Sequence, residues 1–175
     1  TAALQTLAMQ GGSFAVELLP LAEGNAYGLE EVEFQVAANP GVPARNLAKV
    51  ASGGELSRIS LAIQVATSRV ASVPTLIFDE VDSGIGGRVA EIVGKLLKKL
   101  GKDYQVLCVT HLPQVAATAD HHWCVIKAVE EGVTLSHITV LNGVQRVEEI
   151  ARMLGGVKIT DTTRKHAAEM LSAAA

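Results

Sequence analysis

Aromatic residues are scarce in this sequence. Phe, Trp and Tyr make up 3% of the 175 residues, whereas 49% of the residues are hydrophobic. Aliphatic side chains must therefore form the core, which favours sheets covered by helices over an aromatic-rich β-sandwich. Long hydrophobic runs are also absent, because no apolar stretch reaches the about 18 residues that a membrane-spanning helix needs. We expect one domain, or a large piece of one, that does not span a membrane.

The sequence has few cysteines and no net positive charge. The two cysteines, Cys108 and Cys124, lie within apolar, strand-like runs, so the sequence predicts no disulfide framework. The formal net charge of −3 excludes a chain that binds DNA through its overall charge. The sequence does not begin with a basic segment followed by a continuous apolar one, so we expect no signal peptide and a cytoplasmic location.

The sequence also lacks G-x-x-x-x-G-K-[S/T], a loop that wraps nucleotide phosphates. The nearest approach is Gly94-Lys95-Leu96, where Val89 stands in place of the first glycine and Leu96 in place of the hydroxyl residue. Any phosphate-handling residues in this chain therefore need a phosphate-holding loop from elsewhere.

Hydrophobic periodicity predicts strands that alternate with helices. The expected elements, in chain order, are the tail of a helix at 1–10, a hairpin with strands at 14–19 and 32–36, a helix at 53–71, a strand at 75–79, a helix at 88–100, a strand at 105–110, and closing helices at 147–154 and 161–171. The segment 75–110 makes a βαβ unit, so its two strands should be parallel and close neighbours. A second such step is expected through 112–119 to a strand at 123–127, with 133–141 added in antiparallel fashion.

The tetrad Ser52-Gly53-Gly54-Glu55 opens the helix predicted at 53–71. It has the pattern of a capping box, with serine as the N-cap and glutamate at the third helical position. Two glycines would nevertheless destabilise a helix interior by about 1 kcal/mol each, and somewhat less near its end. Bare backbone at a helix N-terminus lets a phosphate approach the N–H groups and the positive end of the helix dipole. The tetrad is therefore either a helix start alone or a helix start that also binds an anion.

Two carboxylates, Asp79 and Glu80, stand where the apolar strand at 75–79 ends. Open α/β sheets bind ligands at the carboxyl ends of their strands. Asp79 suits a Mg²⁺ ligand, directly or through the water shell, because hard cations prefer carboxylate oxygen. Glu80 suits the base that orients an attacking water. The plainer alternative is a solvated junction between a strand and a loop.

His111 ends the second strand of the same βαβ unit. Parallel topology brings it to the sheet edge that also holds Asp79 and Glu80. An imidazole there suits a hydrogen bond to a terminal phosphate oxygen or to a lytic water. A histidine after a strand is usually structural, but two neighbouring carboxylates favour a functional one.

Two other groups of residues look like sites but are interpreted as structural. Neither a C-x-x-C pair nor regular spacing supports a zinc site among Cys108, His111, His121, His122 and Cys124. The lysines of the helix at 88–100 and just beyond it are more typical of a solvated helix face than of a contact to a phosphate backbone. They are Lys95, Lys98, Lys99 and Lys102.

With these residues placed, the sequence resembles the ABC-type ATPase heads of the SMC class and, within it, the RecN family of bacterial DNA repair proteins. VASGGELSR at 50–58 is similar to the signature motif, TLIFDE at 75–80 to Walker B, VDSGIGG at 81–87 to the D-loop, and VTHLPQVA at 109–116 to the switch-histidine segment. The resemblance implies the C-terminal half of an α/β, ABC-type P-loop NTPase head, with a mostly parallel sheet flanked by helices and an additional antiparallel hairpin. Residues 1–10 would end a coiled coil, and residues 11–175 would form the C-terminal lobe, without the Walker A lobe.

The resemblance also implies cofactors, partners and roles. ATP and Mg²⁺ would be the cofactors, with Asp79 supporting Mg²⁺, Glu80 polarising water and His111 sensing the γ-phosphate on its own head. The signature residues Ser52, Gly53, Gly54 and Glu55 would close over ATP held by a second head, and Asp82 would cross that interface. The N-terminal Walker A lobe, a second head and, through the full-length protein, DNA would be the partners.

The implied function is an ATPase in DNA double-strand break repair and recombination, cytoplasmic and nucleoid-associated. ATP binding would engage two heads, and hydrolysis would release them. The isolated chain is expected to be inactive, because the Walker A lysine and the Q-loop lie in the other lobe of such heads. Two alternatives stay open: a head of another SMC-like protein, of the RecF or SbcC type, or a non-catalytic, ATP-gated module that tethers DNA.

Overall fold

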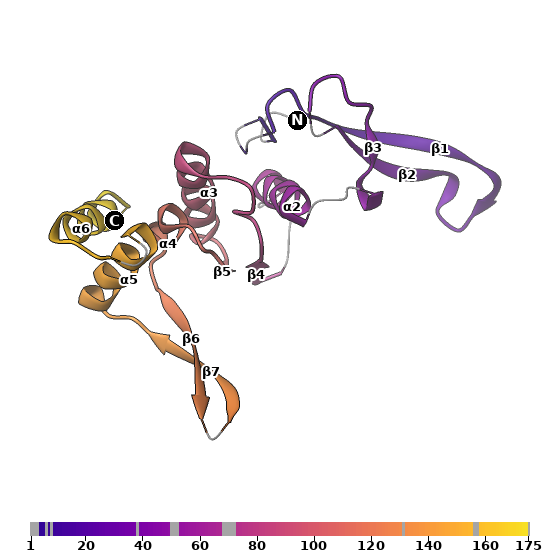
Figure 1. Ribbon diagram of the computed structural model, residues 1–175. Coiled ribbons are helices and arrows are strands. Elements are labelled where there is room, and N and C mark those ends of the chain that lie inside the picture. Colours follow the sequence, from indigo (N-terminus) through magenta and orange to yellow (C-terminus); the bar gives the residue numbers. More distant parts are fainter. Residues whose placement is uncertain are drawn as a thin grey trace.

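The computed structural model describes residues 4–5, 7, 9–37, 39–49, 53–67, 73–130, 132–155 and 158–174. Two β-hairpins project in different directions from a body made mostly of helices (Figure 1). The expected end of a coiled coil at 1–10 falls largely outside the described residues, where Leu4 and Gln5 are helical. That assignment stays a prediction.

The N-terminal hairpin pairs β1 (Ser13–Asn25) with β2 (Gly28–Ala37) in antiparallel register. The short strand β3 (Arg45–Asn46) continues this sheet along β2, and the 3₁₀ helix η1 (Leu47–Lys49) follows. Both long strands run beyond their predicted ends. The chain reverses at residues 26–27, where the Asn25 side-chain oxygen accepts the Tyr27 N–H at 2.7 Å, a local bond of the kind that stabilises turns at asparagine.

The centre of the molecule contains the helix α2 (Gly53–Thr67), followed by the predicted βαβ unit. This unit comprises β4 (Thr75–Phe78), α3 (Gly87–Leu100) and β5 (Gln105–Cys108). β4 and β5 pair in parallel, from Thr75 opposite Gln105 to Phe78 opposite Cys108, which confirms the prediction. The apolar stripe of α3 also faces the core, with Val93, Leu97 and Leu100 buried.

The buried face of α2 differs from the predicted one. The sequence favoured a stripe through Leu56, Ile59 and Ile63, but Leu56 is 44% exposed. The buried positions are Gly54, Arg58, Ile59, Leu61 and Ala62. Because an arginine occupies this face, a search for apolar spacing shifts the stripe around the helix. The predicted end of this helix, at 68–71, lies outside the described residues.

After β5, the chain forms α4 (Pro113–Thr118) and then a second hairpin of β6 (Trp123–Glu130) and β7 (Val133–Val140). The antiparallel pairing of β6 with β7 confirms the expected addition at 133–141. The predicted second βαβ step is wrong for the described residues, since β6 pairs with β7 and not with β5. A strand that follows a helix need not return to the same sheet when its hairpin partner follows at once.

Two hydrophobic cores hold the body together. The larger one joins Leu7 and Met9 to α2, β4 and α3. The smaller one packs α4 against the closing helices α5 (Gly143–Gly155) and α6 (Asp161–Ala174), around Ile150 and Ala167. Both closing helices are longer than predicted. Among the described residues, no helix is long and apolar enough to cross a bilayer.

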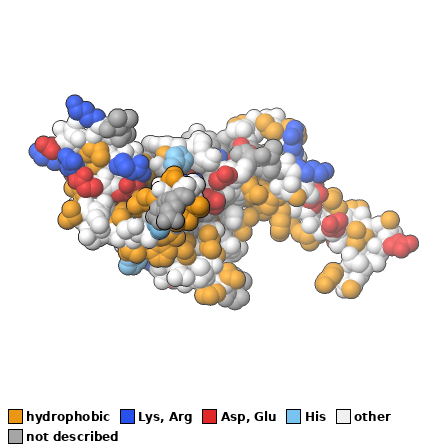
Figure 2. Space-filling view, turned by 60° about the horizontal axis from the view of Figure 1, so that its bottom comes forward, with side chains coloured by type: hydrophobic (Ala, Val, Ile, Leu, Met, Phe, Trp, Pro, Cys, Tyr) orange, Lys and Arg blue, Asp and Glu red, His pale blue; other side chains and the backbone are white. Residues whose placement is uncertain are grey.

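Many large hydrophobic side chains lie outside these cores. Figure 2 shows hydrophobic side chains over the β1–β2 hairpin, which projects to the right, and across the centre of the face in view. On the two hairpins, the side chains with about half or more of their surface exposed include Val16, Leu18, Val32, Phe34, Trp123, Val125, Ile138 and Val140. On the parallel pair, Ile77 is 72% exposed. The fold is therefore α/β as predicted, with an unusually uncovered set of strand surfaces.

Candidate functional site

The parallel pairing of β4 and β5 brings two loops to one edge of the sheet. Phe78 and Cys108 are opposite each other, and the Val109 N–H donates to the Phe78 carbonyl at 2.9 Å, just beyond the last paired residues. Asp79 and Glu80 leave β4 at this edge, and His111 follows β5 there. Topology therefore gathers the three residues as the sequence indicated, although their chemical roles stay predictions.

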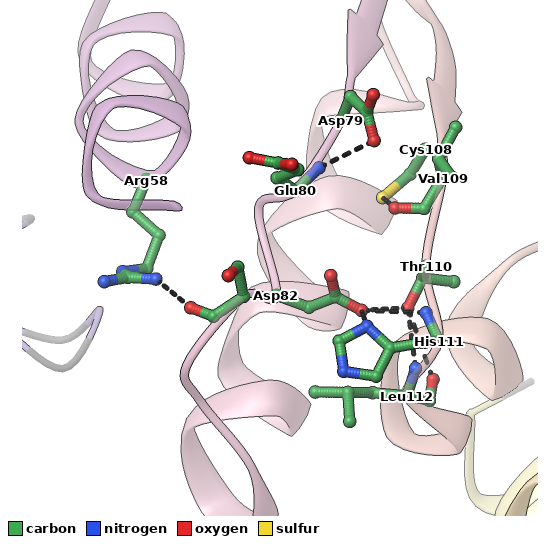
Figure 3. Close-up of polar contacts among 10 residues, drawn as sticks. Arg58, Asp79, Glu80, Asp82, Cys108, Val109, Thr110, His111 and Leu112 are labelled. Carbon is green, nitrogen blue, oxygen red and sulfur yellow. Dashed lines mark hydrogen bonds and ion pairs between the residues drawn. The ribbon is translucent and has the colours of Figure 1, made fainter. Parts of the chain in front are cut away.

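Glu80 turns the chain sharply at the end of β4. It has a φ of 56°, the only positive value at a non-glycine residue in the described part of the chain. Such a conformation costs on the order of 1 kcal/mol or more and needs support from its surroundings. The Asp79 Oδ1 atom gives part of that support by accepting the Glu80 N–H at 2.9 Å. The turn points the two exposed carboxylates in different directions, as Figure 3 shows, so they can serve different groups.

Asp82 lies two residues further on, and its side chain points into the protein. It is 2% exposed, and its Oδ2 atom accepts the Thr110 hydroxyl at 2.5 Å and the His111 backbone N–H at 3.1 Å. The Nδ1 atom of His111 is 3.4 Å from the same oxygen. The role that the resemblance implied for Asp82, crossing to a second head, stays a prediction.

The N-terminus of α2 packs against this same turn. A Cβ atom added to Gly54 would stand 2.8 Å from the Ser83 Cβ and 3.0 Å from the Ser83 carbonyl oxygen. A Cβ on Gly53 would meet the Glu80 carboxylate. The glycines thus allow close packing within the chain, a reason that the sequence reading missed. The serine of the same tetrad, Ser52, lies outside the described residues.

Arg58 and Thr110 are two site residues that sequence reasoning did not find. Arg58 is 7% exposed, and its Nη1 donates to the Ser83 carbonyl at 2.6 Å. Burial lowers the pKa of its guanidinium, with Glu55 acting in the opposite direction. Thr110 accepts the Leu112 N–H while donating to Asp82. An arginine within a largely apolar helix is a signal for the first residue, but no local signal marks the second.

Cys108, the last residue of β5, lies beside the site and has a weakly acidic thiol. Burial, together with the nearby charges of Asp82 and Asp79, raises the pKa of its thiol to about 12. The thiol therefore stays protonated near neutral pH, and the thiolate is the reactive form. Among the described residues, no group of three or more His, Cys, Asp or Glu side chains could hold a metal ion.

One carboxylate at the site nevertheless suits Mg²⁺. Asp79 is exposed, and only its Oδ1 atom takes part in a hydrogen bond with another described residue. Mg²⁺ keeps several waters and is commonly held by one or two carboxylates together with substrate phosphates. A single exposed aspartate fits that mode of binding, whereas an all-protein cage would need more ligands.

The lysine-rich face of α3 carries ion pairs within the chain. Lys95 pairs with Glu91, and Lys98 lies 3.7 Å from Asp120. These contacts agree with the predicted solvated helix face.

No protein-family model matches the chain. Curated proteins that are similar to it are DNA repair proteins RecN. RecN of Xylella fastidiosa (strain 9a5c) is 51% identical over 170 residues, which cover 96% of this chain and 30% of that protein. RecN of Vibrio cholerae is 49% identical, covering 98% of this chain and 31% of that protein. RecN of Bacillus subtilis is 46% identical, covering 84% of this chain and 26% of that protein.

Solved structures of SMC head domains share the fold. A Pyrococcus yayanosii Smc head with a coiled coil and joint matches 85% of this chain and 27% of that chain, with a TM-score of 0.61 and 22% identity. A chain from structural work on ATP-driven dimerization of SMC ATPases matches 89% of both chains, with a TM-score of 0.55 and 21% identity.

The chain spans about three tenths of the length of the curated relatives described above, and their identity to it extends over nearly its whole sequence. The same segment contains the four sequences that resemble motifs of the SMC class, and it shares the fold of SMC heads. The chain belongs to the RecN family.

Proposed function

We propose that this chain is the C-terminal lobe of a RecN ATPase head that acts in DNA double-strand break repair. The observation that carries the proposal is the meeting of Asp79, Glu80 and His111 at one sheet edge, in a sequence that has no phosphate-holding loop. The RecN relatives are DNA repair proteins, and the matching SMC chain comes from work on ATP-driven dimerization. These likenesses support an ATPase over an unrelated use of the same fold.

Each residue has a task that its placement permits. Asp79 would hold Mg²⁺ through a carboxylate oxygen, and the metal would neutralise phosphate charge. Glu80 would orient the attacking water and accept its proton. His111, with 70% of its side chain exposed, would accept a hydrogen bond from the lytic water next to the terminal phosphate. The signature residues 52–55 would contribute at an interface with a second head.

The uncovered strands support a missing lobe of the same head. β4 and β5 form a two-stranded parallel sheet among the described residues, with Ile77 and Val109 each more than half exposed. Parallel sheets are normally covered on both faces and extend over more strands. The N-terminal lobe with the Walker A lysine would extend and cover this sheet. We therefore propose that the chain alone lacks ATPase activity.

A Glu80→Gln substitution in the full-length protein tests the proposal. Amide replaces carboxylate with the same shape, so ATP binding and head engagement should persist while turnover is lost. We expect ATP-dependent head dimers that last longer than those of the unsubstituted protein, measured by size-exclusion chromatography with light scattering. Glu31→Gln, on the exposed hairpin, is the matched control. Loss of turnover with unchanged DNA repair would instead favour a non-catalytic tether.

A further inference from the structure

A single carboxylate oxygen of Asp82 organises the loop that carries His111. Three groups of that loop approach it: the Thr110 hydroxyl at 2.5 Å, the His111 N–H at 3.1 Å and the His111 Nδ1 at 3.4 Å. Figure 3 shows the carboxylate between the β4 turn and this loop, with the imidazole ring beside it. A buried carboxylate with several donors is strongly held, because charge-assisted hydrogen bonds are short and strong.

The contacts fix both the backbone and the ring of His111. The His111 N–H donates to Asp82, and the Leu112 N–H donates at 3.1 Å to the Thr110 hydroxyl, which itself donates to Asp82. The peptide groups on both sides of His111 are therefore held. The ring is mostly exposed even though its anchor is 2% exposed. With Nδ1 facing the carboxylate, the proton belongs on Nδ1, and the Nε2 atom is turned away from it. With the proton on Nδ1, the Nε2 atom of a neutral ring is left as a hydrogen-bond acceptor.

On its other side, the same turn is hydrogen-bonded to α2. Arg58 of α2 donates to the Ser83 carbonyl at 2.6 Å, and the Ser83 N–H donates to the Glu80 carbonyl at 3.0 Å. Gly54 lies in close contact with Ser83. Residues 80–83 therefore lie between α2 and the loop after β5, and they make direct hydrogen bonds to both.

From this geometry we infer that Asp82 is a positioning residue for His111 within its own chain. Asp82 sets the rotamer and tautomer of the imidazole. The turn that carries Asp82 also links the ring to α2 through Ser83 and Arg58. The inference rests on the proposed function for the role of His111 in ATP hydrolysis. It differs from the expected role of Asp82 as a residue that crosses to a second head, because the buried oxygen is already committed to Thr110 and His111.

A double-substitution cycle in the full-length protein tests the inference. His111→Gln should lower kcat by about 100-fold or more, the scale of general acid–base contributions, because the ring nitrogen that binds the lytic water is lost. Asp82→Asn should lower kcat by about 10-fold, the scale for losing a group that orients an active-site ligand, with the KM for ATP unchanged within about twofold. The double variant should be no slower than His111→Gln alone, because Asp82 acts through the ring. Asp103→Asn, at an exposed aspartate, is the control.

A second pair of variants guards against a fold defect at the buried aspartate. Thr110→Val removes one donor and keeps Asp82, so kcat should fall several-fold, whereas Thr110→Ser keeps the hydroxyl and should retain full turnover. The ¹⁵N shifts of the imidazole, measured in histidine-labelled protein, should report Nδ1–H in the unsubstituted chain and mixed tautomers in Asp82→Asn. If Asp82→Asn does not fold, the Thr110 pair decides the question.

The outcomes separate the inference from the proposed function. If His111→Gln leaves turnover unchanged, the proposed role of His111 is wrong. If His111→Gln lowers turnover while the Asp82 and His111 effects multiply, Asp82 acts independently and the inference is overturned. A rise in the KM for ATP in Asp82→Asn alone would assign Asp82 to nucleotide contact across the interface. Equal turnover in the Thr110→Val and Thr110→Ser proteins would also overturn it.

Discussion

The turn at 80–83 and the two projecting hairpins differ in how many of their side chains find partners within this chain. In the turn, Asp82 and the Ser83 carbonyl are hydrogen-bonded to the β5 loop and to α2. On the hairpins, large apolar side chains such as Val125 and Ile138 are more than 60% exposed. The chain therefore holds its polar, chemistry-bearing loops in place by itself but leaves its strand surfaces uncovered. That difference is expected of a lobe that contributes prepared residues to a larger head.

The largest expected effect lies at the exposed carboxylate beside the turn. Asp79→Asn in the full-length protein should lower the ATPase rate by roughly 10²-fold or more, because a group that stabilises developing charge is lost. The Mg²⁺ concentration for half-maximal activity should rise as well. Steady-state phosphate release across a Mg²⁺ titration measures both, with Asp103→Asn as the control. An unchanged rate would remove Asp79 from the site.

The next largest effect should come from the buried oxygen of Asp82. Asp82→Ala leaves the Thr110 hydroxyl and the His111 N–H without their acceptor, so the free energy of unfolding should fall by about 2–3 kcal/mol. Urea unfolding of the chain, followed by circular dichroism, measures the change. Asp103→Ala should change it by less than about 0.5 kcal/mol. A loss below about 1 kcal/mol for Asp82→Ala would show that the turn is less tightly held than its geometry indicates.

Substitution of the two glycines of α2 should distinguish the effect of packing from that of helix propensity. Gly54→Ala places a methyl group against the Ser83 backbone and should destabilise the chain by about 1–3 kcal/mol, the usual effect of overpacking. Gly53→Ala meets only the far end of the Glu80 side chain, which can turn away. Its stability should stay within about 0.5 kcal/mol, helped by the helix propensity of alanine. Denaturant unfolding of both variants measures the contrast, which equal losses would contradict.

The smallest effect is expected on the hairpin surface. Val125→Thr and Ile138→Thr change cross-strand neighbours that are already exposed, so each should alter the stability of the isolated chain by less than about 0.5 kcal/mol. Thermal unfolding checks this. A loss above about 1.5 kcal/mol would mean that the hairpin supports the body of the chain by itself.

Local patterns in the sequence were enough to predict the βαβ unit and the meeting of its two loops. Those features depend on short runs with clear periodicity and on the direction of parallel strands. Arg58 and Thr110 could not be found in the same way, because their partners lie 25 and 28 residues away in the sequence. The buried face of α2 was misplaced for a related reason, since a charged residue occupies part of it. The hairpin of β6 and β7 shows that a helix before a strand does not fix which sheet the strand joins.

The central claim is that this chain carries catalytic residues of an ATPase head but not the part that holds the nucleotide. Isothermal titration calorimetry with ATP and Mg²⁺, on the chain alone and after addition of the separately produced N-terminal lobe, tests it most directly. We predict no measurable binding by the chain alone and clear binding once both lobes are present, with Asp79→Asn weakening the Mg²⁺ dependence of the combined sample. Tight ATP binding by the chain alone would contradict the claim.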